Sequence, residues 1–273
     1  MIELILFLAA LAFVCELIDS GFGMGYGTIL SPLLIIFGFN PLVVVPSILI
    51  SQAFGGTFAS FFHHRFKNVN FKPNETNRNK LKESVKKDGF IGAFKKTATN
   101  DLKVVAVIII LGVIATIIAV LVAVNIPGWM LKTYIGLLVL AMGLILLSGT
   151  KFVFTWKKMI FVGIISSFNK GMSGGGFGPV VTGGQIIAGK NHKNAIGCTT
   201  LAEAPICIVS FAAYAIINGF PDTNLMMPLI AGAAIAAPIG AMVTSKINPK
   251  KLKVILGVLI TLLGVWTLVK IVL

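Results

Sequence analysis

The sequence GFGMGYG at residues 21–27 is matched by MSGGGFG at residues 172–178, and this pair decides the fold. When the chain is shifted against itself by 151 residues, three glycines of the first run coincide with three glycines of the second. The matched pairs are Gly23 with Gly174, Gly25 with Gly176, and Gly27 with Gly178. A fixed offset of this kind is the mark of an internal repeat, and it must be found before any site is interpreted.

The repeat extends beyond the glycines. The same offset pairs Gly38 with Gly189, Asn40 with Asn191, Gln52 with Glu203, and Ala53 with Ala204. Further along, LKTYIGLLVLAMG at residues 131–143 matches LKVILGVLITLLG at residues 252–264 with an offset of 121. Because the offset falls by 30 residues, the first half must contain an additional loop.

The composition is that of an integral membrane protein, since 56% of the 273 residues are hydrophobic and only 12% are charged. A membrane-spanning helix needs about 20 apolar residues. Runs of this kind lie at residues 2–18, 41–62, 104–124, 131–149, 152–168, 195–217, 225–244 and 252–272. Two shorter runs, 26–39 and 176–189, adjoin the glycine clusters. No run alternates with period two, so we expect an all-α polytopic fold rather than a barrel.

The additional loop runs from residue 65 to residue 103 and carries eleven Lys or Arg against four acidic residues. Its composition predicts a polar connector that is partly disordered or forms short helices. Because it lies between two spans, the positive-inside rule explains its charge better than nucleic-acid binding does, although anionic headgroups are a further partner to consider. We therefore expect a cytoplasmic loop, in a protein of the cell (plasma) membrane.

Other charged loops give the orientation of the two halves. The basic segments 151–158, 189–193 and 246–253 should be cytoplasmic, which leaves 125–129 and 218–224 outside. Equivalent loops then lie on opposite sides, as expected for inverted repeats with an odd number of crossings. We predict about five helical segments per repeat, eight to ten in all, with both termini outside. The predicted divisions are residues 1–64 and 104–150 for repeat 1, the loop 65–103, a linker 151–158, and residues 159–273 for repeat 2. The first run leads into the acidic residues Glu16 and Asp19 instead of a cleavage site, so we expect that run to stay in the mature protein.

The two short runs predict a site. As helices of about 14 residues they would reach only about 21 Å, less than the bilayer core of about 30 Å, so we expect each to begin inside the membrane, and whether they span it fully stays open. Their N-termini, with unpaired N–H groups and partial positive charge, would favour an anion near the centre. The same glycines also fit small-xxx-small helix packing, and the two roles are compatible. Nucleotide binding is not indicated because no strand precedes either run.

The duplicated pattern of a glycine-rich turn, a short apolar run and then a helix with Ser-Gln-Ala (51–53) or Ala-Glu-Ala-Pro (202–205) resembles the TauE/SafE family of sulfite exporters, also called toluene sulfonate uptake permeases. The resemblance covers nearly the whole chain except the basic loop. It implies a secondary transporter for a small anion, such as sulfite, thiosulfate or a sulfonate like sulfoacetate, and it implies no catalytic residue. An anion channel and a non-transporting membrane scaffold remain alternatives.

Charged residues inside the spans are few, and each is therefore informative. Lys170 occupies the position that the first repeat gives to Asp19, so it is a candidate anion contact and a candidate partner of Asp19. Glu203 lies one helical turn after Thr199, and burial would favour its neutral form. Proton coupling and a simple interhelical hydrogen bond both fit Glu203. The predicted substrate-binding residues are Gly23, Gly25, Gly27, Ser51, Gln52, Lys170, Gly174, Gly175, Gly176, Thr199 and Thr200, with Glu203 as the proton-coupling residue.

No enzymatic, cofactor or metal site is predicted. The three cysteines lie inside apolar runs without CxxC spacing, and the three histidines, expected near membrane boundaries, form no HExxH motif. The expected partners are a small anion and the lipid bilayer, without nucleic acid. Homo-oligomer formation, the direction of flux and the coupling ion are left open by the sequence.

Overall fold

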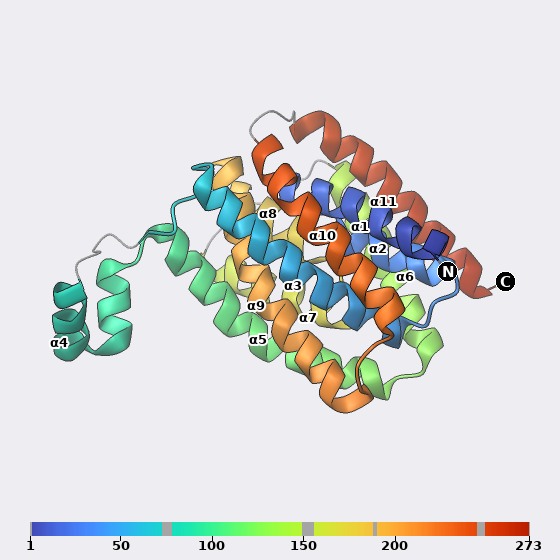
Figure 1. Ribbon diagram of the computed structural model, residues 1–273, viewed down its shortest axis with the longest axis horizontal. Coiled ribbons are helices and arrows are strands. Elements are labelled where there is room, and N and C mark those ends of the chain that lie inside the picture. Colours follow the sequence, from blue (N-terminus) through green and yellow to red (C-terminus); the bar gives the residue numbers. More distant parts are fainter. Residues whose placement is uncertain (1, 73–77, 149–155, 188–189, 245–248, 273) are drawn as a thin grey trace.

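A computed structural model describes residues 2–72, 78–148, 156–187, 190–244 and 249–272, and these residues form eleven helices and no strand (Figure 1). The helices are α1 Ile2–Phe22, α2 Tyr26–Ile36, α3 Pro41–Arg65, α4 Arg78–Thr97, α5 Asn100–Asn125, α6 Gly128–Ser148, α7 Trp156–Ser173, α8 Phe177–Ile187, α9 His192–Asn218, α10 Thr223–Val243 and α11 Pro249–Val272. Six of them, namely α3, α5, α6, α9, α10 and the Val254–Ile271 part of α11, are long and apolar enough to cross a membrane. The all-helical prediction is confirmed. Positions 151–155, 188–189 and 245–248 of the predicted linker, second short run and last basic loop lie outside the described residues.

Ten of these helices form one bundle, with α3 and α9 in contact near its middle (Figure 1). On either side of this pair, α10 packs against α3 and α1, while α5 packs against α9 and α7. The α6–α11 pair covers one flank of the bundle. The short helices α2 and α8 are each followed directly by a central helix, α3 and α9 respectively, on which they pack. The two glycine-rich turns therefore lie inside the bundle.

Asparagine side chains begin both central helices. Asn40 precedes α3 and its Oδ1 accepts a hydrogen bond from the Leu42 N–H at 2.9 Å. Asn191 precedes α9 and accepts from the Lys193 N–H at 3.0 Å. An Asn N-cap satisfies one of the N–H groups that a helix leaves unpaired at its start. The pairing of these two asparagines in the sequence thus reflects the same local structure.

Glycines allow α6 and α11 to approach to backbone contact. A Cβ atom on Gly143 would lie 2.5 Å from the Thr261 nitrogen, and one on Gly264 would lie 2.5 Å from the Leu140 nitrogen. Helices in a bilayer gain little from burying apolar surface, so they associate through such close contacts between small residues. The two glycines that the sequence comparison aligned therefore hold this helix pair together.

The outer surface of the bundle is apolar and its interior is unusually polar. Large side chains such as Phe61, Ile110 and Trp266 are 60% exposed or more, whereas Lys170 and Glu16 are 1% exposed. Exposed apolar surface on this scale would be a liability in water but matches a lipid environment. Six apolar spans and this surface make the chain a multi-pass membrane protein.

The basic loop contains a helical segment, α4, that stands clear of the bundle (Figure 1). The chain breaks its helical conformation at Gly89, where φ is 70° and ψ is 172°, so α4 is two short arms joined by a bend. The prediction of a connector with short helices holds for these residues, since both arms are helical and most of their side chains are exposed.

Candidate functional site

Two glycine-rich turns break the helices at the centre of the bundle. One joins α1 to α2 through Gly23 and Gly25, whose φ values are 71° and 135°. The other joins α7 to α8 through Gly174 and Gly176, with φ values of 73° and 78°. Because L side chains rarely adopt these values, the four positions require glycine for the turn itself.

The two turns touch each other through their backbones. A Cβ on Gly27 would lie only 1.6 Å from the Gly174 carbonyl oxygen, and one on Gly178 would lie 2.3 Å from the Gly23 carbonyl oxygen. Gly175 is similarly close, since its Cβ would lie 2.8 Å from the Gly27 carbonyl carbon. These contacts leave no room for a side chain where α2 and α8 start, so the packing role considered for the glycines is present.

A chain of polar contacts links the two halves beside the turns. The Lys170 ammonium forms a salt bridge of 2.8 Å with Glu203 and donates a hydrogen bond to Gln52 Oε1. Gln52 Nε2 donates to Asp19 Oδ2 at 3.0 Å, and Asp19 Oδ1 accepts from the Tyr26 N–H at 3.2 Å. These five residues come from α9, α7, α3, α1 and α2 and are all buried. Three of the predicted site residues, Gln52, Lys170 and Glu203, are therefore in direct contact.

The direct ion pair between Asp19 and Lys170 suggested by the sequence is not formed. The ammonium pairs with Glu203, and the Gln52 amide lies between it and Asp19. An amide can bridge in this way because it offers an acceptor oxygen and two donor hydrogens. The sequence comparison placed Gln52 and Glu203 at equivalent positions, and these two residues hold the lysine from either side.

The two turns carry opposite charges. At the first turn the Asp19 carboxylate accepts from the Tyr26 N–H, the first residue of α2, so an anion of the protein itself occupies that helix N-terminus. At the second turn the equivalent residue is Lys170, and the Gly176 N–H donates to the hydroxyl of Thr28 at 3.1 Å. A helix N-terminus favours negative charge, and the turn that begins α8 follows Lys170, whose ammonium is paired with Glu203.

Glu16 brings another carboxyl to the same region. Its Oε1 accepts from the Ser20 hydroxyl at 2.5 Å, while Oε2 is buried without a hydrogen-bond partner. A Cβ on Gly55 would lie 2.8–3.0 Å from the carboxyl atoms, so a larger residue at this position would require the Glu16 side chain to shift. The sequence placed Glu16 close to the first turn but assigned it no role.

The predicted hydroxyl groups divide between two situations. Thr199 Oγ1 accepts from Thr182 at 2.9 Å and from Gln185 Nε2 at 2.9 Å, which ties α9 to α8 beneath the first turn. Thr200 Oγ1 donates to the Ile196 carbonyl of its own helix at 2.8 Å. Neither threonine is within the Lys170 network. Thr199 therefore forms interhelical hydrogen bonds, which are the alternative to anion binding for such hydroxyl groups.

Two buried polar residues near the site were not predicted. Tyr26 places its hydroxyl 2.7 Å from that of Ser51, which gives the predicted Ser51 an interhelical partner. His63, expected near the membrane boundary, is buried and lies with Nε2 at 2.9 Å from the Ser20 carbonyl oxygen and Nδ1 at 3.0 Å from Asn68 Nδ2. Tyr26 lies within the glycine run, and this position could have indicated that it belongs near the site. The contacts of His63 depend on tertiary structure and have no such signal in the sequence.

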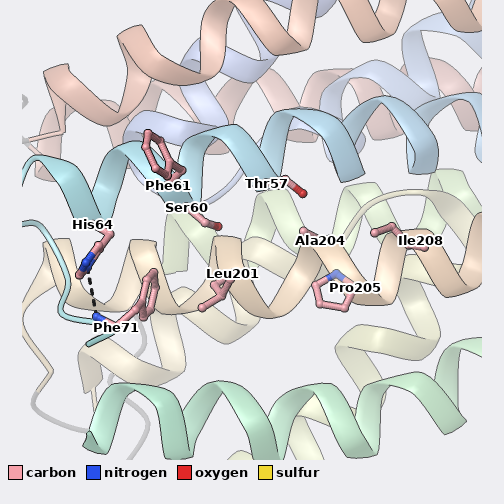
Figure 2. Close-up of a pocket in the computed structure, with 9 residues that line it drawn as sticks. All are labelled: Thr57, Ser60, Phe61, His64, Phe71, Leu201, Ala204, Pro205 and Ile208. Carbon is pink, nitrogen blue, oxygen red and sulfur yellow. Dashed lines mark hydrogen bonds between the residues drawn. The ribbon is translucent and has the colours of Figure 1, made fainter. Parts of the chain in front are cut away.

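A pocket of about 400 Å³ lies between α3 and α9, closed at one end by the segment that follows α3 (Figure 2). It is lined by Thr57, Ser60, Phe61, His64, Phe71, Leu201, Ala204, Pro205 and Ile208. The hydroxyls of Thr57 and Ser60 donate to carbonyls of their own helix, and His64 Nδ1 accepts from the Phe71 N–H at 3.2 Å. The remaining lining is apolar and includes none of the predicted site residues. This pocket therefore shares no lining residue with the Lys170 network.

Comparison with known proteins agrees with this arrangement. The family model described as "Sulfite exporter TauE/SafE" matches residues 8–73 and 89–267. The chain belongs to the TauE/SafE family. The resemblance recognised from the glycine turns is thereby confirmed, and membership places this protein among membrane transporters.

A relative of this chain is described as a probable membrane transporter. The "Probable membrane transporter protein YtnM" of Bacillus subtilis (strain 168) is 28% identical over 286 residues, which cover 98% of this chain and 83% of the relative. No solved structure matches the chain. The Lys170 network and the two glycine turns all fall within the segments matched by the family model.

Proposed function

We propose that this protein is a secondary transporter that carries a small anion through the membrane by alternating access. The observation that carries the proposal is the Lys170 ammonium, which is 1% exposed and is held by Glu203 beside the glycine turn that begins α8. An ionisable residue inside a membrane protein is costly and is usually retained for a function. Here its charge and the N-terminus of α8 both favour an anion.

We infer further that the two halves are inverted repeats. Two hydrogen bonds support the equivalence of the two halves, because His63 contacts the Ser20 carbonyl oxygen and its counterpart Tyr214 donates to the carbonyl of Gly171, the counterpart of Ser20. The inversion itself is inferred from the basic segments, which place equivalent loops on opposite sides of the membrane. The packing between the halves is also reciprocal. Helix α1 of the first half packs on α10 of the second, and its counterpart α7 packs on α5 of the first half. Inverted repeats place the basic loop and the loop between α9 and α10 on opposite sides of the membrane.

Cysteine labelling tests the inversion. The native cysteines, Cys15, Cys198 and Cys207, are buried, so an introduced cysteine can be read above a low background. We expect Asn79→Cys, in the basic loop, to react only from the cytoplasmic side and Asp222→Cys only from outside. Labelling of both from one side would exclude inverted halves.

Charge balance supports coupling to protons. Lys170 lies among three buried carboxyls, those of Glu16, Asp19 and Glu203, which are close enough to interact electrostatically. Fully ionised, the four side chains would leave two uncompensated negative charges, which are costly in a buried site. We infer that bound protons reduce this excess, and that the number of protons changes when the anion binds.

Glu203 is the proposed coupling residue. When its carboxylate takes up a proton, it no longer neutralises the ammonium of Lys170, and an incoming anion can replace it as the counter-ion. Proton and anion then bind together, so each favours the other. A sulfur oxyanion or an organosulfonate, such as sulfite, thiosulfate or sulfoacetate, fits a site with one buried cation and helix N–H donors. The family description, which names sulfite, supports this choice of cargo.

The backbone contact between the turns favours a carrier over a channel. Where Gly27 meets Gly174 there is no space for even a methyl group, so a continuous pore through the turns would require them to separate. A carrier instead exposes its site to one side at a time as the repeats move against each other.

Transport by the purified protein in liposomes is the decisive test. We expect saturable uptake of at least one of labelled sulfite, thiosulfate and sulfoacetate, accelerated by the same unlabelled anion inside and by an inward proton gradient. Acetate and protein-free liposomes serve as controls. Uptake no faster than in protein-free liposomes for every sulfur anion would refute this cargo, and non-saturating flux without counterflow would indicate a channel.

A further inference from the structure

The α4 hairpin carries a surface that neither the bundle nor the proposed transport cycle uses. Its bend at Gly89 leaves two large apolar side chains at the tip, and Phe90 and Ile91 are 75% and 72% exposed. A salt bridge of 2.7 Å between Lys96 and Asp88 joins the two arms across the bend. The tip is therefore an ordered apolar projection, defined here as the α4 tip, and not simply part of a polar loop.

Basic residues surround this tip. The segment 78–97 contains seven Lys or Arg and two acidic residues. Lys86 and Lys87 immediately precede the bend and are exposed, as is Lys95 after it. A short helical element with apolar side chains at one place and lysines around them has the composition of an interfacial membrane-binding element.

The arrangement of the chain favours the host bilayer as the partner. The hairpin is tied at both ends to membrane-spanning helices, because α3 ends at Arg65 and α5 begins at Asn100. The adjacent bilayer is therefore present at a high effective concentration, whereas a soluble partner must be recruited. Positive charge on this side of the membrane also complements the anionic lipids that collect in the cytoplasmic leaflet.

The first arm of the α4 hairpin lies outside the match to the family model. The match to the TauE/SafE model stops at residue 73 and resumes at residue 89, so it leaves out the first arm and its lysines. We propose that the α4 hairpin binds the anionic lipid surface of its own membrane, with Phe90 and Ile91 inserted among the acyl chains and the flanking lysines at the headgroups. This proposal does not rest on the transport proposal.

The proposal can be tested with the full-length protein in lipid nanodiscs. A fluorophore attached at Phe90→Cys reports the tip, and one at Glu83→Cys, an exposed acidic position on the first arm, is the control. Because the three native cysteines are buried, they need not be removed. We expect lipids brominated on their acyl chains to quench the Phe90 probe when the discs contain phosphatidylglycerol, and to leave the Glu83 probe unquenched.

Charge variants separate binding to anionic lipid from insertion driven by the apolar tip alone. Quenching should be lost in pure phosphatidylcholine, at about 1 M salt, where the Debye length falls to about 3 Å, and in Lys86→Glu/Lys87→Glu. The charge-preserving variant Lys86→Arg/Lys87→Arg should retain it. Equal quenching in phosphatidylcholine would overturn the role of charge. Absence of quenching in every disc would overturn the proposal, as would protection of the probe only by an added soluble protein.

Discussion

The two glycine turns share a backbone design and differ in charge. In both turns, glycines with positive φ interrupt the helical conformation, and a short helix follows. At the first turn Asp19 accepts from the N–H of Tyr26, whereas at the second the equivalent residue is Lys170, paired with Glu203. The same backbone structure thus occurs twice, and the two turns differ in the charged residue at one position. Under the proposed function, the first turn holds a carboxylate of the protein and the second accepts the transported anion.

The largest effect is expected where the turns meet. Gly27→Ala places a methyl group 1.6 Å from a carbonyl oxygen that belongs to the backbone and cannot swing away. Overpacking a core typically costs about 1–3 kcal/mol, and a clash with fixed backbone should exceed that range. We expect little folded protein by size-exclusion chromatography and thermal unfolding.

The matched control is Gly183→Ala in α8, where an added Cβ meets nothing within 4 Å. Alanine is favoured over glycine within a helix, so this variant should be as stable as the wild type or slightly more so. If Gly27→Ala were equally stable, the two turns would not be in backbone contact.

The next effect concerns the charge at the second turn. Lys170→Met leaves Glu203 buried without its cation, and removing one partner of a buried ion pair costs about 3–5 kcal/mol. We expect lower thermal stability and no anion uptake. The double variant Lys170→Met/Glu203→Gln should recover much of the stability because position 203 no longer carries an unpaired charge, yet it should not recover transport. Recovery of both would make the pair purely structural.

A smaller and more selective effect is expected for Glu203→Gln. The amide keeps a hydrogen-bond acceptor for Lys170 but cannot take up a proton, so anion binding should no longer rise as the pH falls. We expect uptake driven by a proton gradient to be lost while exchange of labelled for unlabelled anion continues. A wild-type pH profile for gradient-driven uptake would show that coupling lies elsewhere, with Asp19 and Glu16 as the neighbouring carboxyls to examine.

The smallest effect is expected at the first turn. Asp19→Asn retains an oxygen that can accept from the Tyr26 N–H but loses the acceptor of the Gln52 Nε2 hydrogen bond, so the loss of stability should be about 1–3 kcal/mol. Because Asp19 contacts Lys170 only through Gln52, we expect transport and its pH dependence to persist. Loss of transport as complete as in Lys170→Met would mean that the two turns contribute equally, and the comparison would fail.

Local features of the fold could be predicted from the sequence. The apolar runs located the spanning helices, and the paired Asn40 and Asn191 marked the starts of α3 and α9 because an N-cap depends on adjacent residues only. The glycine clusters located both turns for the same reason. These signals depend only on residues that are adjacent in the chain, so they can be recognised in a single sequence.

Partners within the site could be predicted only in part. Lys170 and Glu203 were each recognised because charge is rare inside a membrane, but their pairing with each other was not. Gln52, which lies 118 positions from Lys170 in the chain, prevents the ion pair between Lys170 and Asp19. The contacts of His63 and Tyr26 likewise depend on how distant helices meet. Such contacts depend on tertiary packing and cannot be predicted from local sequence patterns.

The α6–α11 contact has a consequence for the origin of the molecule. Gly143 meets Thr261 while Gly264 meets Leu140, and these are the same two positions of the repeat with their roles exchanged. Reciprocal contact of this kind defines an isologous interface, the type that joins two identical subunits about a twofold axis. Under the proposed inverted arrangement, a half-length ancestor inserted in both orientations would assemble as a homodimer through this surface. Such a homodimer would have carried the same residue at both turns, so aspartate at one turn and lysine at the other required two separate copies of the sequence.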